Sequence, residues 1–529
     1  MRFPNEAFFR RIRGVFYQKR CLYGKDASMQ NRTVSLPFPT GLFECDGVDF
    51  SELRRLISAV WERIQQQLCE FFAEPITPRA THEFEITFAN LLRKIGREIV
   101  MRVYNQIEPD HAEFALRRIV FEGETYRRKP KSRNRHLGTL FGTITLDRFL
   151  YEPLEPGARS IFPLEINLGI EARNATPALA ARVGELAASS TQSEVLSTLV
   201  RDHDVSWSVG TLRNVTASLS AGMSPHGHEV QVRRVHDWLG EASASQGRHK
   251  PVLSVGRDGI FVPIRNEKGY KEGAVATISV YNRKRRRLGT VYQAQMPEPG
   301  QPTLSRELTN LIEDVLWQSE GRLPRLSDVT DAGHHPTEYD NGVLSKMRHP
   351  RHPHQRLEWI RIVDFYHASE YVGKLSAALF GETRAAHAWA RKMCQWLKHK
   401  PNAVFRLLHS AAKHKSEQRL SSRDQQAYES ADGYLKNHKA FMDYAEYQRQ
   451  GLPIGSGVTE AGCKTVFTQR FKQSGMSWHV EDGQTILNLR LIHLSKLWIE
   501  VHQSYLASKP LADMPTKRIL ATKTLKKAA

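Results

Sequence analysis

The chain has 529 residues, and Lys and Arg outnumber Asp and Glu by 76 to 56, which gives a formal net charge of +20. This length exceeds one ordinary hydrophobic core, so we expect two or more domains. The charge favours a polyanionic partner such as nucleic acid, although a basic protein without such a partner has the same composition. The five cysteines form no CxxC pair, which argues against a disulfide framework or a zinc ribbon. No apolar run approaches the roughly 20 residues that span a bilayer, so we expect a cytoplasmic location.

Residues 1–125 are predicted to form a helical N-terminal region. Within residues 51–108, apolar side chains recur at intervals of three and four, as in a helix that buries one face. Examples are Leu53, Leu56, Ile57, Val60 and Ile64. This region is expected to serve packing.

Residues 126–223 are predicted to combine a basic β segment with helices. The glycines of LGTLFGTITLDRFLY favour a bend or hairpin. A run of cations precedes them and either forms a solvated face or contacts phosphates. These cations are Arg127, Arg128, Lys129, Lys131, Arg133 and Arg135.

Two helical stretches separated by the break DVSW fit a helix-turn-helix, which would lay residues 208–220 in a DNA groove. The second stretch carries Thr211, Arg213, Asn214 and Thr216. Any helical hairpin has the same pattern, so DNA binding and plain packing both remain open. Residues 224–249 are rich in Gly, His, Ser and Arg and are predicted to form a linker.

From residue 250 the pattern changes to strands and helices in alternation. Three strands are predicted within residues 251–264, 273–281 and 287–295, followed by a helix that Thr303 would cap. Two more short strands are expected, before Asp331 and before Asp364, and the connection between them has room for a helix. The order of three strands, helix, strand, connection and strand is that of a ribonuclease-H-like mixed sheet. Residues 367–451 then read as an all-helical insertion, and a last strong helix is expected around residues 486–506.

Three acidic residues lie where apolar side chains are expected. Asp258 shares the period-two face of its strand with apolar residues, and Asp331 ends a strand, where an open sheet presents ligands. Glu460 begins a helical stripe that Cys463 and Phe467 continue. Three converging carboxylates repel one another, and two Mg²⁺ ions roughly 3.5 to 4 Å apart would remove that penalty and serve phosphodiester chemistry. The alternative is that each acid pairs separately with an arginine.

Two nearby features leave a choice. Asp328 and Asp331 fall on opposite faces by strand period, so only one can face the other acids, and the strand end favours Asp331. Histidines cluster after this strand, which invites a zinc site. Their irregular spacing and the lack of paired cysteines favour a solvated loop or phosphate contacts instead. These histidines are His334, His335, His349, His352 and His354.

The C-terminal half resembles the bacterial insertion-sequence DDE transposases of the ISKra type, which are related to the Mutator-like group. The matching motifs are VGRDGIFVP, SDVTDAG, VDFYHASEYV and PIGSGVTEAGCKTVFTQRFKQSGMSW, of which the last is the most specific. The resemblance covers about residues 250–505 and, more weakly, residues 135–220.

The resemblance implies a DNA transposase that cleaves element ends and transfers the 3′ strand to target DNA. Asp258, Asp331 and Glu460 would hold Mg²⁺ or Mn²⁺, as two ions, and Asp364 and His367 would match a DxxH motif that supports the site. The partners would be the terminal inverted repeats and target DNA, bound by a homo-oligomer in the bacterial cytoplasm at the nucleoid. Further cations expected to contact DNA are Arg285, Arg286, Lys464, Arg470 and Lys472.

The expected architecture is multidomain α+β, with a DNA-binding N-terminal part and a ribonuclease-H-like core built from residues 250–366 and 452–506. The helical insertion precedes the last carboxylate, and residues 507–529 form a basic tail. Two other functions share these features: a non-catalytic DNA-binding protein derived from a transposase, and a host nuclease that cuts without joining.

Overall fold

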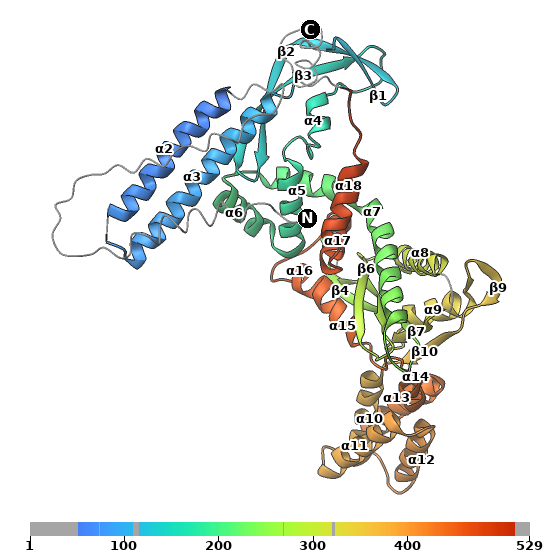
Figure 1. Cartoon of the computed structure of the whole chain (residues 1–529). Coiled ribbons are helices and arrows are strands. Elements are labelled where there is room, and N and C mark those ends of the chain that lie inside the picture. Colours follow the sequence, from blue (N-terminus) through green and yellow to red (C-terminus); the bar gives the residue numbers. More distant parts are fainter. Residues whose placement is uncertain (1–50, 74, 109–115, 268, 320–322, 514–529) are drawn as a thin grey trace. The chain divides into compact units, whose positions relative to one another are not determined.

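The computed structural model describes residues 51–73, 75–108, 116–267, 269–319 and 323–513. The chain divides into two compact units between Ala89 and Asn90. The described residues form a mixed α+β structure (Figure 1). No helix among them is long and apolar enough to cross a membrane. The first fifty residues of the expected helical region, and residues 514–529 of the expected tail, lie outside the described residues.

The helices α2 (Ser51–Ala73) and α3 (Pro78–Asn105) confirm the periodicity noted for residues 51–108. In the first unit the rings of Phe71 and Phe84 stack with their centroids 4.4 Å apart. The predicted helical region extends too far, however, because strand β1 (Arg118–Phe121) begins before residue 125.

A three-stranded antiparallel sheet follows, in the order β1-β2-β3, with β2 (Glu124–Thr139) and β3 (Gly142–Pro153). Gly142 closes the tight turn between the two long strands with a φ of 121°, a conformation that favours glycine. This confirms the predicted hairpin. The short helix α4 (Pro163–Asn167) packs Leu164 against the buried side of the sheet.

Three helices come next: α5 (Pro177–Ser189), α6 (Gln192–His203) and α7 (Val209–Ala244). A capping box fixes the start of α6, since the Thr191 side chain accepts from the Glu194 backbone and the Glu194 carboxylate accepts from the Thr191 backbone. The two helical stretches around DVSW are therefore present as α6 and the start of α7.

The predicted linker at residues 224–249 is wrong, because α7 continues through them to Ala244. The later part of α7 buries Val230, Val235 and Leu239 in the core of the second unit. Burial against that core outweighs the weak helix propensity of the Gly, His and Ser residues.

The centre of the second unit is a five-stranded sheet in the order β10-β7-β4-β5-β6. The strand β4 pairs antiparallel with β5 and parallel with β7, and β7 pairs parallel with β10. The strands predicted from the sequence are all present. Their bounds are β4 (Val252–Pro263), β5 (Tyr270–Tyr281), β6 (Arg287–Gln295), β7 (Arg325–Thr330) and β10 (Trp359–Val363).

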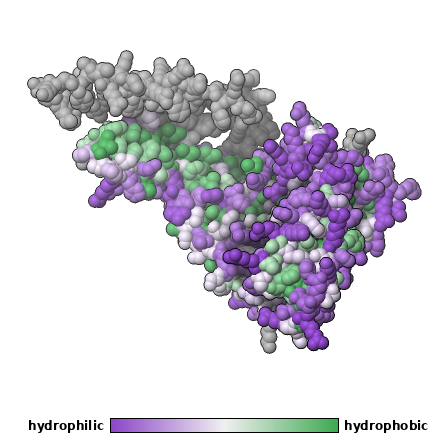
Figure 2. Space-filling view, turned by 90° about the horizontal axis from the view of Figure 1, so that it is seen from below, coloured by the Kyte–Doolittle hydropathy of each residue, from purple (hydrophilic) through white to green (hydrophobic). Residues whose placement is uncertain are grey.

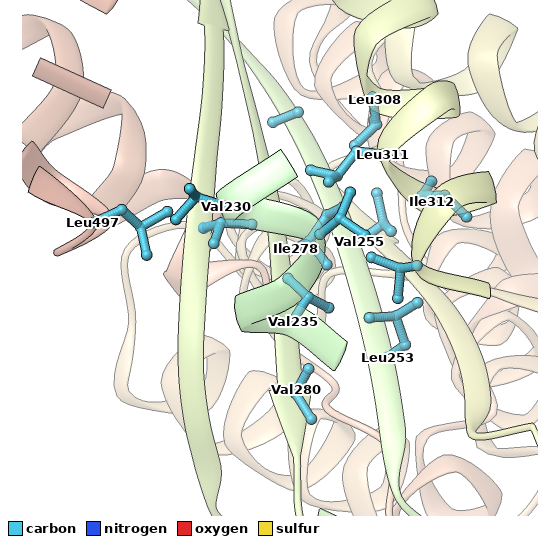
Figure 3. Close-up of a cluster of buried hydrophobic side chains, with 14 of the residues drawn as sticks. Val230, Val235, Leu253, Val255, Ile278, Val280, Leu308, Leu311, Ile312 and Leu497 are labelled. Carbon is cyan, nitrogen blue, oxygen red and sulfur yellow. The ribbon is translucent and has the colours of Figure 1, made fainter. Parts of the chain in front are cut away.

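Most residues of β4 and β5 are buried, so both faces of this sheet are covered. On one face, side chains of α7 and α8 (Pro302–Gln318) meet Leu253 and Val255 of β4 and Ile278 of β5 (Figure 3). The sequence predicted Thr303 as the N-cap of α8, but the N-cap is Gln301. Thr303 lies inside the first turn and bonds to Glu298.

The connection from β7 to β10 holds the helix α9 (His334–Gly342) and a small hairpin of β8 (Arg348–His349) and β9 (His352–Arg356). The expected all-helical segment then follows, and it packs around Leu375, Leu407 and Leu435. Figure 2 views the molecule from the end where these helices lie, and hydrophilic residues cover most of that face. The helices are α10 (Phe365–Phe380), α11 (Arg384–His399), α12 (Ala403–Ser416), α13 (Ser422–His438) and α14 (Tyr444–Gln450).

The chain returns to the sheet through α15 (Gly457–Cys463), a π-helical turn at Lys464–Thr468 and α16 (Gln469–Phe471). The last predicted helix is in fact two, α17 (Val480–Leu494) and α18 (Trp498–Ser508). Lys496, with a positive φ of 58°, lies in the break between them. The break lets Leu497 and Val501 enter the same core as α7.

Candidate active site

Asp258 lies in the middle of β4, on the face of the sheet opposite α8. The neighbouring Arg257 points the other way and donates hydrogen bonds to Ser305 and Gln301 at the start of α8. The Asp258 carboxylate accepts a hydrogen bond from the Cys463 thiol at 3.3 Å and one from the Gly259 backbone at 2.7 Å. The central strand therefore holds one acid at a fixed position beside α15.

Asp331 directly follows the last residue of β7. Its carboxylate accepts a hydrogen bond from the Gly333 backbone at 2.9 Å, and Ala332 between them has a φ of 65°. Tyr434 of α13 donates its hydroxyl to the Asp331 carbonyl at 3.0 Å. The helical segment thus contributes directly to the position of the second acid.

Glu460 lies on α15, which crosses the sheet at close range. The Thr459 hydroxyl is 2.8 Å from that of Thr277 on β5, and both are buried. A Cβ on Gly256 would lie 2.2 Å from the Thr459 hydroxyl oxygen, so only glycine allows this approach. A Glu460 carboxylate oxygen lies 2.6 Å from the hydroxyl oxygen of Ser456, four residues earlier.

The three acids line one cavity of about 210 Å³. Asp258 and Asp331 are half-buried there, and Glu460 is exposed. They therefore face an open cavity and not the apolar core that the sequence pattern had suggested for them. The other lining residues are Arg257, Tyr366, His367, Glu370 and Ser456. Tyr366 leaves 63% of its surface exposed at this cavity.

The charges of the other two carboxylates affect the pKa of Asp258. Burial raises the pKa of Asp258 to about 6, and the charges of Asp331 and, to a smaller extent, Glu460 add to this shift. Burial and the same three acids raise the pKa of the Cys463 thiol, which stays protonated and can act as a hydrogen-bond donor. Asp258 is thus the member of the group whose pKa both other acids raise.

Asp364 is fully buried and lies behind the cavity. Its side chain caps α10 by accepting from the His367 backbone at 2.8 Å. Its other oxygen accepts a hydrogen bond from the Ser456 backbone and lies within hydrogen-bond distance of the Ser456 hydroxyl, whose single proton can be donated either to Asp364 or to Glu460. The same hydroxyl lies beside Glu460, so Ser456 links Asp364 to Glu460. His367, in contrast, lines the cavity itself.

Asp328 lies on the other face of β7, as strand period requires. It is 1% exposed, and burial raises its pKa to about 8, with Asp340 raising it further and Arg361 and Arg257 opposing the shift. It does not line the cavity of Asp258 and Asp331. Asp331, and not Asp328, therefore shares this cavity with Asp258.

The donor set of the cavity consists of carboxylate oxygens, which Mg²⁺ and Mn²⁺ prefer. Among the described residues, one group of His, Cys, Asp or Glu side chains has three possible ligand atoms within 4.8 Å of one another. This group is His334, His335 and Glu338 of α9. Asp258, Asp331 and Glu460 do not converge that closely.

The histidines after β7 separate into two groups. His334 and His335 line a second cavity of about 320 Å³, which shares Asp258 and Asp331 with the first. Glu338 lies 3.3 Å from the His334 ring and 3.4 Å from that of His335. His349 and His352 lie instead on the β8–β9 hairpin.

Most of the residues predicted to contact DNA are exposed or partly exposed, but Arg470 and Thr216 are buried. Arg470 is 1% exposed and donates to the Ala187 carbonyl at 3.1 Å, so the prediction that it contacts DNA is wrong. Thr216 is also buried, with its hydroxyl bonded to the carbonyls of Leu212 and Arg213. Exposed or partly exposed are Arg127, Arg128, Lys129, Lys131, Arg133, Arg135, Thr211, Arg213, Asn214, Arg285, Arg286, Lys464 and Lys472.

Several contributors to the site were not predicted from the sequence, among them Ser456, Tyr434 and Thr277. Ser456 stands four residues before Glu460, a helical spacing that could have indicated a side-chain contact. Tyr434 and Thr277 are remote in the sequence from the acids they support, and no local pattern marks them.

A comparison with models of known protein families finds no match to this chain, and a comparison with curated proteins finds none either.

Proposed function

We propose that this chain is a metal-dependent enzyme that cleaves and transfers DNA strands, a DDE transposase with a ribonuclease-H-like core. The five-stranded sheet supports this proposal, since three antiparallel strands are followed by two parallel ones in the order β10-β7-β4-β5-β6. The long helical segment between Asp331 and Glu460 agrees with the insertion that the sequence resemblance implies.

The single observation that carries the proposal is the shared cavity of Asp258, Asp331 and Glu460. The three acids come from a central strand, the end of its parallel neighbour and a separate helix. The mutual charge effect on Asp258 is the kind that bound cations relieve. A set of independent salt bridges would instead place a cation against each acid, and the ion pairs of the described residues include none of these three carboxylates.

Asp258, Asp331 and Glu460 would hold Mg²⁺ or Mn²⁺, which when bound activate the attacking oxygen and stabilise the leaving oxygen of a phosphodiester. The other residues of the chain prepare this site. Cys463 and Gly259 orient the Asp258 carboxylate, and Ser456 orients Glu460. The exposed cations of β2 and of the Lys464 turn would hold the DNA phosphates.

The test uses the purified chain, DNA duplexes that carry candidate element ends, and Mg²⁺ or Mn²⁺. We expect cleavage followed by joining of the 3′ end to a second DNA. The variants Asp258→Asn, Asp331→Asn and Glu460→Gln should each lower the cleavage rate by at least about 100-fold while DNA binding persists. Glu429→Gln, an exposed acid on α13, is the matched control and should cleave normally.

The products separate the three functions that share this arrangement. Cleavage without joining would indicate a nuclease, and binding without cleavage would indicate a non-catalytic descendant of a transposase. Full cleavage by Asp258→Asn would refute the assignment of the acids.

A further inference from the structure

A cavity of about 1030 Å³, which we call the basic cleft, lies at the edge of the sheet where β7 and β10 begin. Five Lys or Arg side chains line it, against one acid, Glu358, and one of the five, Arg449, is ion-paired with Glu446. The five cations are Lys250, Arg325, Arg351, Arg356 and Arg449.

The basic cleft is separate from the carboxylate cavity. Arg325 is the first residue of β7 and Asp331 follows the last one, so the two sites flank opposite ends of the same strand. At a rise of about 3.3 Å per residue, the strand separates them by roughly 20 Å. No residue lines both the basic cleft and the carboxylate cavity.

The turn between β5 and β6 adds positive charge at this edge. Tyr281 at the end of β5 pairs with Val252 at the start of β4, so Arg285 and Arg286 in the turn lie at the edge opposite Asp331. Burial, followed by the charges of Arg248, Arg285 and Arg325, lowers the pKa of His249. The cleft and the turn therefore belong to one positively charged region.

An exposed aromatic ring adjoins the cleft. Trp317 is 54% exposed, and the Arg351 guanidinium lies 5.6 Å from the centre of its ring. Trp317 lines a second hollow of about 670 Å³, which shares His349 with the basic cleft. Cations beside an exposed aromatic face are typical of surfaces that bind nucleic-acid strands, because the phosphates meet the charges and a base can stack on the ring.

We propose that the basic cleft binds the phosphate backbone of a nucleic-acid segment other than the one that meets the carboxylates. The inference rests on the proposed function, since it assumes a nucleic-acid substrate at the carboxylates. An acidic protein is the alternative occupant, but it would not require the exposed ring of Trp317 beside the charges. Arg285 and Arg286, which the sequence marked as DNA contacts, would serve this second segment and not the cleavage site.

The test measures binding of a short labelled duplex and of its single strand, without divalent metal and over a range of salt concentrations. The full chain is compared with Lys250→Gln/Arg351→Gln and with the control Arg406→Gln/Arg423→Gln, which removes two exposed cations of α12 and α13. Each phosphate that is no longer neutralised should lower the slope of log affinity against log salt by about 0.9 for duplex DNA. We expect the salt dependence of the cleft variant to become less steep by about twice this amount, and that of the control to stay unchanged.

Stoichiometry gives the second readout. The wild-type chain should bind two short duplexes or strands per chain in sedimentation experiments, and the cleft variant should bind one. A photo-crosslinker at Gln355 in the cleft should label the DNA, whereas one at His409 on α12 should not. An unchanged slope and stoichiometry with both DNA forms would overturn the inference.

These outcomes are independent of catalysis. If the cleft variant binds like the wild type while Asp258→Asn loses cleavage, the inference fails and the proposed function stands. If Asp258→Asn still cleaves while the cleft variant loses the second segment, the assignment of the acids fails instead.

Discussion

Two aspartates of the central strands illustrate how position decides the chemistry of a residue. Asp258 on β4 and Asp328 on β7 both have a raised pKa, chiefly because of burial. Asp258 opens into a cavity with two other acids, which a cation can join. Asp328 is buried on the opposite face, where the charges of Arg361 and Arg257 oppose the rise in its pKa.

The stability of the chain should depend on pH through Asp328. The folded chain keeps the Asp328 proton up to about pH 8, whereas an ordinary aspartate releases it near 3.8. Between these values the folded state binds more protons than the unfolded state, so the free energy of unfolding falls as pH rises. Asp328→Asn should remove this loss, and its advantage in thermal stability should grow from about pH 4 to about pH 8.

Thermal unfolding of both proteins at several pH values checks the expectation. The exposed Asp237→Asn serves as the control and should not change the pH profile. An Asp328→Asn variant whose stability parallels that of the wild type at every pH would contradict the assigned pKa.

Asp364 is expected to act as a positioning residue for Glu460. Ser456→Ala removes the link between the two acids but leaves the Asp364 cap on α10 intact. We expect both Ser456→Ala and Asp364→Asn to require more Mg²⁺ for half-maximal cleavage, by roughly 10- to 100-fold as is usual for groups that orient metal ligands. DNA affinity measured without metal should not change. An unaltered Mg²⁺ requirement would assign Asp364 a role in folding alone.

At the scale of elements, the contact between α15 and the sheet decides where Glu460 lies. Gly256 on β4 and Thr459 on α15 meet without room for another atom, and Thr277 on β5 completes the contact. The π-helical turn that follows α15 has its carbonyls bonded by Arg490 of α17. Both contacts join segments that are far apart in the chain.

Gly256→Ala should displace α15 and Glu460 with it. The added Cβ would lie 2.2 Å from the Thr459 hydroxyl oxygen, and such overpacking costs about 1 to 3 kcal/mol. Cleavage should fall more than DNA binding does. Gly227→Ala is the matched control, because no atom lies within 4 Å of its added Cβ inside α7, and it should leave the chain as stable or more so.

A second variant keeps this prediction testable. Gly256→Ala/Thr459→Ala removes the closest clashing atom and should recover part of the missing stability, as chemical denaturation can measure. Equal stability of the single and double variants would show that Thr459 does not limit the approach of α15.

Arg490 should be among the most sensitive residues of the C-terminal helices. It is 4% exposed and donates hydrogen bonds to the carbonyls of Thr465, Val466 and Ala188. Arg490→Met leaves these carbonyls without their donor, and we expect a loss of roughly 3 to 5 kcal/mol in the free energy of unfolding. The exposed Arg306→Met on α8 should change it by less than about 0.5 kcal/mol.

At the scale of the whole molecule, the excess of positive charge is divided among separate surfaces. The β2 strand carries one group of exposed cations, and the basic cleft, where β7 and β10 begin, carries another. Arg470 and Arg490 contribute to the net charge but are buried, with burial lowering the pKa of each to about 10. Net charge alone therefore overstates the surface available for DNA.

The β2 cations should account for a measurable part of the salt dependence of DNA binding. Arg127→Gln/Lys131→Gln/Arg133→Gln should lower the slope of log affinity against log salt by about 0.9 for each phosphate that these cations neutralise. The control Arg406→Gln/Lys413→Gln/Arg423→Gln removes three exposed cations from α12 and α13. Equal slopes for the wild type and the β2 variant would indicate that these cations form only a solvated surface.

The sequence alone determined which segments become the strands of the central sheet, because period-two patterns and turn residues are local. It also singled out Asp258, Asp331 and Glu460, since acids at apolar positions are visible in the pattern. The predictions of a linker at residues 224–249 and of a DNA contact by Arg470 were wrong. Local composition does not reveal that distant segments bury α7 and Arg470.

Only the tertiary structure decided that the three acids share one cavity, that Ser456 lies between Asp364 and Glu460, and that the basic cleft and the acids lie at opposite ends of β7. These features depend on contacts between segments that are far apart along the backbone. Packing free energy selects such contacts from the whole chain at once, whereas propensity and periodicity act within a few residues.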